Sequence, residues 1–269
     1  MFASLKEQPA DKILALMQQF KDDPRDQKID LGVGVYKDAN GHTPIMRAVK
    51  VAEKALWDVQ DTKTYVALVG DGAFSDAMID LLLSQTLPRD AIAAAATPGG
   101  TGAVRQAFEL AQMANPTVRI FVSDPTWPNH LSILRHLEIE MVPYRYFDND
   151  TRGVDHAGML GDLSKARVGD IVLLHGCCHN PTGANLILPQ WQEVIDMLLK
   201  TGATPMIDIA YQGFGDGLEQ DVEGLNYLIK NVSEAMVAVS CSKNFGVYRD
   251  RVGVAIVVSE AAEKDIVQD

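Results

Sequence analysis

Two spacings of apolar residues alternate along the chain. Apolar residues three and four positions apart predict helices, and short uninterrupted apolar runs predict buried strands. We predict strands at residues 92–97, 118–123, 140–147, 171–175, 205–209, 235–239 and 254–258. We predict helices at residues 11–20, 45–59, about 72–84, within 125–136, 188–200 and 222–231. A further helix follows residues 98–103 and has residues 104, 107, 108 and 111 on one face, and residues 161–166 are predicted to be part of another. This strand-then-helix order predicts an α/β fold, in which a mostly parallel sheet carries helices on both faces.

A glycine-rich turn, Gly99-Gly100-Thr101, joins the first predicted strand to a helix. Such a turn points free N–H groups and the positive end of the helix dipole at an anion. It has neither the GxGxxG spacing of dinucleotide sites nor the GxxxxGK[ST] spacing of P-loops. Phosphate binding and a plain tight turn are equally consistent with this pattern. Residues 31–36 (LGVGVY) also allow two interpretations. Their glycines permit close approach either of a ligand or of another chain segment that crosses there.

Composition narrows the class of protein. The chain has 269 residues, 47% of them apolar, and its 24 basic against 36 acidic residues give a net charge of -12. This balance argues against a nucleic-acid or anionic-membrane surface. No apolar run has membrane-spanning length, and residues 1–6 lack the features of a secretory signal. The three cysteines, two of them adjacent, indicate a reducing compartment, so we expect a cytoplasmic protein.

Residues with reactive or polar side chains follow several predicted strands, where open α/β sheets bind their ligands. Lys243 lies in a turn between two serines, and a desolvated lysine can act as a nucleophile or base, although most loop lysines are solvated. Asp208 interrupts an apolar strand, and a buried carboxylate must be paired or bound. The other residues of this kind are Trp127, Asn180, Tyr211 and Arg251.

Other kinds of site fit the residues less well. His175, Cys177, Cys178 and His179 suggest zinc, but adjacent cysteines chelate poorly and no second CxxC or HxxxH is present, so we predict no metal. A Ser–His–Asp catalytic triad is weakly supported, because the sequence contains no G-x-S-x-G motif. A nucleotide enzyme using the glycine turn stays a minor alternative. Pyridoxal phosphate requires these residue types together: a lysine for its aldehyde, a carboxylate for its ring nitrogen, an aromatic face for its ring, and a helix N-terminus with hydroxyls and an arginine for its phosphate.

Six motifs in order carry a resemblance to a known family. They are LGVGVYKD, TPGGTGA, P-x-WPNH, HGCCHNPTG, D-x-AYQGF and S-x-SKNFG-x-Y-x-x-RVG, between residues 31 and 253. Together they resemble the aspartate/aromatic-amino-acid aminotransferases, which are fold-type I pyridoxal-phosphate enzymes. The resemblance implies pyridoxal 5'-phosphate as cofactor and the large-domain fold of that class.

The resemblance also implies a role for each matching residue. Lys243 resembles the Schiff-base lysine and proton shuttle, and Asp208 the partner of the ring nitrogen. Tyr211 and Asn180 resemble donors to the ring 3'-oxygen, and Trp127 the residue stacked on the ring. The implied catalytic residues are thus Lys243, Asp208, Tyr211 and Trp127, and the implied phosphate-binding residues are Gly99, Gly100, Thr101, Ser240, Ser242 and Arg251.

Three more residues have implied roles. Tyr65 resembles a tyrosine that reaches the phosphate of the neighbouring subunit, which implies a homodimer with shared sites. Gly34, with Trp127 and Asn180, resembles the substrate-binding residues. His175 resembles a partner near Asp208, and the Asn180-Pro181 bond is expected to be cis.

The implied reaction moves an amino group from L-aspartate, or an aromatic amino acid, to 2-oxoglutarate in a ping-pong cycle between pyridoxal and pyridoxamine phosphate. The implied domains are residues 1–45, an N-terminal arm and the start of the small domain, and residues 46–269, the large cofactor-binding domain. The chain ends before the family's carboxylate-binding arginines, so the small domain is incomplete. The alternative is therefore a truncated cofactor-binding domain with little or no turnover.

Overall fold

The computed structural model describes residues 12–30, 32, 34–83 and 87–259. The chain divides into two compact units, Met1–Pro44 and Ile45–Asp269. In the described part of the first unit, one helix, α1 (Lys12–Asp22), covers most of the predicted helix at 11–20. The motif at residues 31–36 lies partly outside the described residues, because positions 31 and 33 are not among them.

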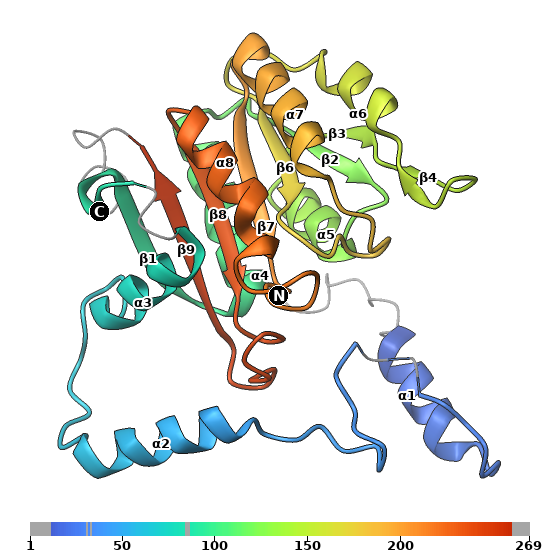
Figure 1. The fold of residues 1–269 in the computed structure, drawn as a ribbon, viewed down its shortest axis with the longest axis vertical. Coiled ribbons are helices and arrows are strands. Elements are labelled where there is room, and N and C mark those ends of the chain that lie inside the picture. The colour runs from blue at the N-terminus through green and yellow to red at the C-terminus, as the bar shows by residue number, and fades with distance from the viewer. Residues whose placement is uncertain (1–11, 31, 33, 84–86, 260–269) are drawn as a thin grey trace, which may run out of the picture. The chain divides into compact units, whose positions relative to one another are not determined.

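A seven-stranded sheet forms the centre of the second unit (Figure 1). Its strands lie in the order β1-β9-β8-β7-β6-β2-β3. Their bounds are β1 (Ile92–Pro98), β2 (Arg119–Asp124), β3 (Glu140–Arg145), β6 (Ile171–His175), β7 (Thr204–Ile209), β8 (Ala235–Ser240) and β9 (Val252–Val258). The pairs from β8 to β3 are parallel, and only β9 runs antiparallel to its two neighbours. The predicted α/β fold with a mostly parallel, mixed sheet is confirmed.

Alternate residues of each strand face opposite sides of the sheet, and both sides are covered. On β6, Val172 and Leu174 belong to one apolar cluster, and Ile171 and Leu173 belong to another. The first cluster contains side chains of α3 (Gly72–Leu83), α6 (His156–Leu163), α7 (Leu188–Thr201) and α8 (Glu223–Asn231). The second contains side chains of α4 (Gly99–Ala114) and α5 (Pro128–His136). Burial on both faces explains why the strands are continuous apolar runs.

Two predicted elements differ from the structure in their bounds. The predicted strand at 140–147 divides into β3 and a short β4 (Phe147–Asp148), which pairs with β5 (Gly153–Val154) outside the main sheet. The helix predicted to include residues 161–166 is α6, which ends at Leu163 and starts at His156, where the Asp155 side chain caps its first turn by accepting a hydrogen bond from the Gly158 N–H.

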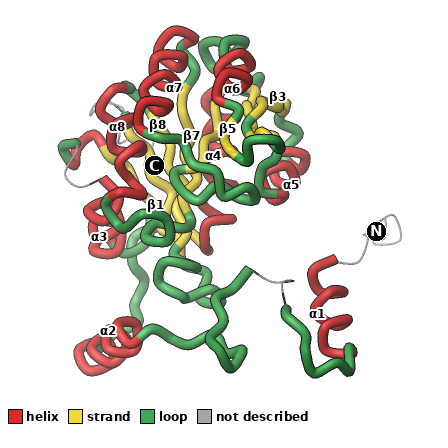
Figure 2. The backbone as a smooth tube through the Cα atoms, turned by 45° about the vertical axis from the view of Figure 1, so that its right-hand side comes forward, coloured by secondary structure: helices red, strands yellow, loops and turns green. Residues whose placement is uncertain are grey.

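Helix α2 (Arg47–Val59) follows the prediction at 45–59 and is flanked by long loops, green in Figure 2. None of its residues is buried, although Val51, Leu56, Trp57 and Val59 are apolar. No helix in the part of the chain that the structure describes is long and apolar enough to cross a membrane.

Candidate active site

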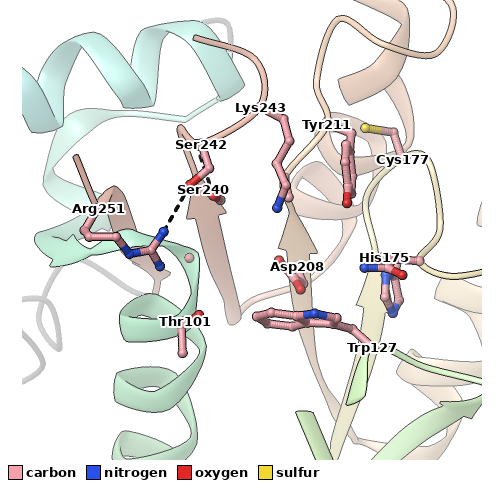
Figure 3. A pocket seen from close by; sticks show the side chains of 13 residues that line it. Thr101, Trp127, His175, Cys177, Asp208, Tyr211, Ser240, Ser242, Lys243 and Arg251 are labelled. Atoms are coloured by element: carbon pink, nitrogen blue, oxygen red, sulfur yellow. Dashed lines mark hydrogen bonds between the residues drawn. The ribbon is translucent and has the colours of Figure 1, made fainter. Parts of the chain in front are cut away.

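A pocket opens at the carboxyl ends of β6, β7 and β8, where parallel sheets bind ligands (Figure 3). Each of the three strands contributes a polar side chain near its end, and the helix starts at α4 and α5 contribute others. The residues that line the pocket are Gly100, Thr101, Trp127, His175, Cys177, Asn180, Asp208, Ala210, Tyr211, Ser240, Ser242, Lys243 and Arg251. Eleven of the residues that the sequence analysis gave a role thus meet in one pocket.

One end of the pocket, which we call the anion end, is built around the start of α4. Its residues are Gly99, Gly100, Thr101, Ser240, Ser242 and Arg251. A Cβ on Gly99 would lie 2.6 Å from the Arg251 Nη2 atom, and one on Gly100 would lie 2.7 Å from the Ser240 Cβ. Only glycine fits these two positions, so the turn brings backbone N–H groups against the β8–β9 loop. No side chain caps the helix start, and its N–H groups are available to an anion.

Arg251 provides the positive side chain of the anion end. Its Nη1 donates to the Tyr248 carbonyl at 3.1 Å and lies 3.5 Å from the Ser242 Oγ (Figure 3). In the described residues, Arg251 forms no ion pair with a carboxylate. The Ser242 backbone N–H donates to the Ser240 Oγ at 3.2 Å. The anion end therefore combines a guanidinium, two hydroxyls and a helix N-terminus, a set that suits a phosphate.

The other end of the pocket, the carboxylate end, is centred on Asp208 and includes His130 and His175. The Asp208 Oδ2 is 2.9 Å from the Nε2 of His130, whose side chain is fully buried. Burial acts to raise the pKa of Asp208, but the hydrogen bond from His130 and the charges of His130, His175 and Lys243 lower it below its usual value. The carboxylate is therefore ionised and available to a protonated ring nitrogen.

His130 is a site residue that the sequence analysis quoted in a motif but did not assign. Its Nδ1 is 2.9 Å from the Thr126 Oγ1, which is also 3.3 Å from the His175 Nε2. His175 and Asp208 are register partners on β6 and β7, and the centroid of the His175 ring lies 5.4 Å from that of His130. His130 lies three residues after Trp127, one turn into α5, and this helical spacing was the available signal.

Lys243 projects into the pocket between the two ends (Figure 3). Burial lowers the pKa of its ammonium group. The charge of Arg251 lowers this pKa as well, whereas the charge of Asp208 raises it. Its Nζ lies 5.1 Å from the centroid of the Tyr211 ring. No hydrogen bond or ion pair joins it to the other described residues, so its amine is free to react.

Trp127, Tyr211 and Asn180 complete the walls between the two ends. The Trp127 ring packs edge to face against His130, with centroids 5.2 Å apart. Burial and the charge of Asp208 raise the pKa of Tyr211, which keeps its hydroxyl protonated as a donor. The Asn180-Pro181 bond is cis, as predicted, and Asp124-Pro125 is a second cis bond that was not predicted.

Three predicted site residues do not line this pocket. Gly99 contributes through its packing against Arg251. Tyr65 is fully exposed, at 101%, and Gly34 is an exposed residue of the first unit. The predicted roles of Tyr65 and Gly34 stay predictions.

The pocket fits pyridoxal phosphate on the chemistry of its donors. Among the described residues, a lysine amine without a hydrogen-bond partner lies between an arginine without a carboxylate partner and an ionised carboxylate that is mostly buried. The phosphate, aldehyde and ring nitrogen of the cofactor are spaced along one flat molecule, and each requires one of these groups.

Comparison with known proteins identifies the family. The profile described as "Aminotransferase class I and II" matches residues 26–267. The chain is 57% identical to the aromatic-amino-acid aminotransferase of Paracoccus denitrificans, and the match covers all of this chain and 68% of that protein. It is 44% identical to the aspartate aminotransferase of Haemophilus influenzae, and this match covers 98% of this chain and 67% of that protein.

A solved structure agrees with this assignment. The aromatic-amino-acid aminotransferase from Burkholderia pseudomallei, described as covalently bound to pyridoxal phosphate, matches with a TM-score of 0.96 and 35% identity. The match covers 100% of this chain and 68% of that one, so the chain spans about two thirds of its relatives' length. By sequence, fold and pocket, this chain belongs to the pyridoxal-phosphate-dependent aminotransferases of class I and II.

Proposed function

We propose that the protein transfers an amino group from L-aspartate or an aromatic amino acid to 2-oxoglutarate in a ping-pong cycle. The names of its relatives include both specificities. The observation that carries the proposal is the place of Lys243, a free amine between the anion end and the carboxylate end of one pocket. Bound pyridoxal phosphate supplies a carbonyl that accepts the amino group and a ring that withdraws electrons from the substrate Cα.

Different residues of the chain would bind different parts of the cofactor. The anion end, from Gly99 to Arg251, holds the phosphate. Asp208, fixed by His130, keeps the proton on the ring nitrogen. Because burial lowers the pKa of Lys243, its Nζ can attack a carbonyl carbon and afterwards carry a proton from the substrate Cα.

The side walls of the pocket orient the ring. We propose that Tyr211 and Asn180 donate hydrogen bonds to the ring 3'-oxygen, since both line the pocket with donors. Trp127 offers an aromatic face to the ring and to the substrate. Asn180 and Gly34 complete the proposed substrate side.

A homodimer in the cytoplasm is part of the proposal. The exposed apolar side chains of α2, with the exposed Tyr65, support a subunit contact on this segment, since such groups are usually covered. Tyr65 would then reach the phosphate of the neighbouring subunit. The free thiols of Cys177, Cys178 and Cys241 agree with a reducing compartment.

Cofactor attachment tests the first step of this proposal. The purified protein should be yellow, and borohydride should remove the visible absorbance and leave the cofactor covalently attached. Lys243→Ala should lose this covalent attachment, whereas Lys200→Ala, at an exposed position of α7, should keep it. A colourless protein that takes up no added pyridoxal phosphate would contradict the proposal.

Reaction with amino acids separates an enzyme from a cofactor-binding domain without turnover, the alternative reading. Aspartate or phenylalanine, mixed with the yellow protein, should shift the absorbance to that of the aminated cofactor. Comparing the two amino acids also decides the preferred substrate. If the cofactor is attached but neither amino acid changes its spectrum, the protein is a cofactor-binding domain without turnover.

A further inference from the structure

The turn after β6 places two thiols and a carboxylate together. Consecutive residues of an extended chain point to opposite sides, so adjacent cysteines ordinarily do not share a ligand. Here Cys178 has a left-handed φ of 47°, which turns the chain. As a result, the Sγ atoms of Cys177 and Cys178 and a carboxylate oxygen of Asp221 all lie within 4.8 Å of one another.

Backbone amides hold the Asp221 carboxylate in place. Its Oδ2 accepts hydrogen bonds from the N–H groups of Gly213 and Gly215 at 2.7 and 3.0 Å, and its Oδ1 accepts one from Asp216 at 2.8 Å. Each carboxylate oxygen can accept two bonds, so Oδ1 has one lone pair left. Over the described residues, no lysine, arginine or histidine forms an ion pair with Asp221. This buried carboxylate is therefore fixed and still able to bind a cation.

The thiols select the kind of cation. Sulfur is a soft ligand that zinc and similar cations prefer, whereas magnesium and calcium prefer oxygen ligands. Both cysteines are free thiols, so a bound cation replaces the protons on their sulfur atoms. Ligand atoms of a tetrahedral zinc site lie roughly 3.8 Å apart. A contraction of at most about 1 Å would close this cluster around such an ion.

We propose that Cys177, Cys178 and Asp221 form a binding site for one soft divalent cation of the zinc and cadmium class. Two S–H bonds are broken, two metal–sulfur bonds form, and two protons pass to solvent, with no oxidation or reduction. Asp221 supplies the third ligand, and water completes the tetrahedron. Because Cys177 also lines the active-site pocket, the ion would lie at the edge of that pocket. This site does not depend on the proposed transamination.

Titration of the pyridoxal-phosphate-saturated protein with Cd²⁺ tests the proposal. We expect one ion per chain, ultraviolet sulfur-to-cadmium absorbance, release of two protons per ion in weak buffer, and displacement by Zn²⁺ but not by Mg²⁺. Loss of an outer-shell partner costs a metal site about 10- to 100-fold in affinity. We therefore expect Cys178→Ser, which loses a ligand, to bind Cd²⁺ at least about 100-fold more weakly.

Cys241→Ser is the matched control, because Cys241 is also a buried thiol but does not belong to the cluster. It should retain the cadmium signal and the release of two protons. Circular dichroism melting should show that both variants are folded. Absence of the absorbance in the unmodified protein, release of fewer than two protons, or a signal that Cys178→Ser retains and Cys241→Ser loses would overturn the proposal.

Discussion

The two ends of the active-site pocket are built by different means. At the anion end, backbone N–H groups of the α4 start, two serines and Arg251 face the pocket, and the geometry is fixed by glycines that admit no Cβ. At the carboxylate end, side chains contact one another from Asp208 through the buried His130 and Thr126 to His175. The first end offers positive charge to a ligand, and the second offers negative charge.

Under the proposed function, this difference gives binding and chemistry to separate groups of residues. The anion end would contact a part of the cofactor that does not react, so its contacts would add affinity equally before and during the reaction. The carboxylate end would contact the ring that takes up electrons, so its charge would matter most as the substrate Cα loses a proton. Substitutions at the two ends should therefore change different measured quantities.

The largest effect is expected from Asp208→Ala. Loss of the carboxylate removes the group that we propose keeps the ring nitrogen protonated, and we expect the transamination rate at saturating cofactor to fall at least about 1,000-fold, which is about 4 kcal/mol. Cofactor affinity should change far less, because the anion end is intact. Single-turnover kinetics and a cofactor titration measure the two effects. Asp196→Ala, at an exposed position of α7, is the control. Near-normal turnover would refute the role of Asp208.

The opposite pattern is expected from Arg251→Gln. A charge-assisted hydrogen bond contributes about 1.5–3 kcal/mol, so cofactor affinity should fall about 10- to 100-fold. The rate at saturating cofactor should stay near normal. Arg251→Lys should lose less affinity, since it keeps the charge but not the planar donors. Arg249→Gln, two residues away and exposed, should bind the cofactor normally. A large loss of rate with normal affinity would contradict the division between the two ends.

The fold was predictable where burial leaves a simple pattern. Strands such as β6 and β8 are buried on both faces, so they are unbroken apolar runs. The end of β3 was not predictable, because Tyr144 and Tyr146 are both buried, so the alternation of a strand continues past Arg145 while the chain leaves the sheet there. The early start of α6 depends on one capping contact of Asp155.

The pocket was predictable where a residue type is unusual for its place, as with Asp208 inside an apolar strand or Lys243 between two serines. The family resemblance then assigned their roles. His130 was missed because its contact with Asp208 joins positions 78 apart in sequence, and only the folded chain brings them together. The clustering of Cys177 with Cys178 was contrary to expectation, because a left-handed residue cannot be read from the sequence.

Acid should destabilise the carboxylate end and its surroundings through the histidines there. Burial, with the charges of neighbouring histidines, lowers the pKa of His175 to about 3 and that of His179 to about 4. An unfolded histidine has a pKa of about 6.5, so below that pH the unfolded chain binds more protons than the folded one. Stability should fall as the pH decreases from 7 to 5, by about 2 kcal/mol for each ring.

Urea unfolding across this pH range measures that slope. Asp208 does not contribute to it, because the lowered pKa of a carboxyl group gives stability that is lost only below its unfolded value of about 3.9. His179→Gln should reduce the slope by about half, whatever it costs in overall stability. His136→Gln, at an exposed position of α5, is the control. A slope that His179→Gln leaves unchanged would contradict the assignment to these buried rings.

The smallest effect is expected from Ser242→Ala, and it tests how far the backbone builds the anion end. The Ser242 Oγ is 3.5 Å from Arg251, at the limit of a hydrogen bond, whereas its backbone N–H donates to Ser240 and survives the substitution. Loss of one neutral hydrogen bond costs about 1 kcal/mol, or about fivefold in cofactor affinity. Ser132→Ala, an exposed serine of α5, should have no effect in the same cofactor titration. If Ser242→Ala weakened binding as much as Arg251→Gln, hydroxyl groups and not backbone amides would dominate this end of the pocket.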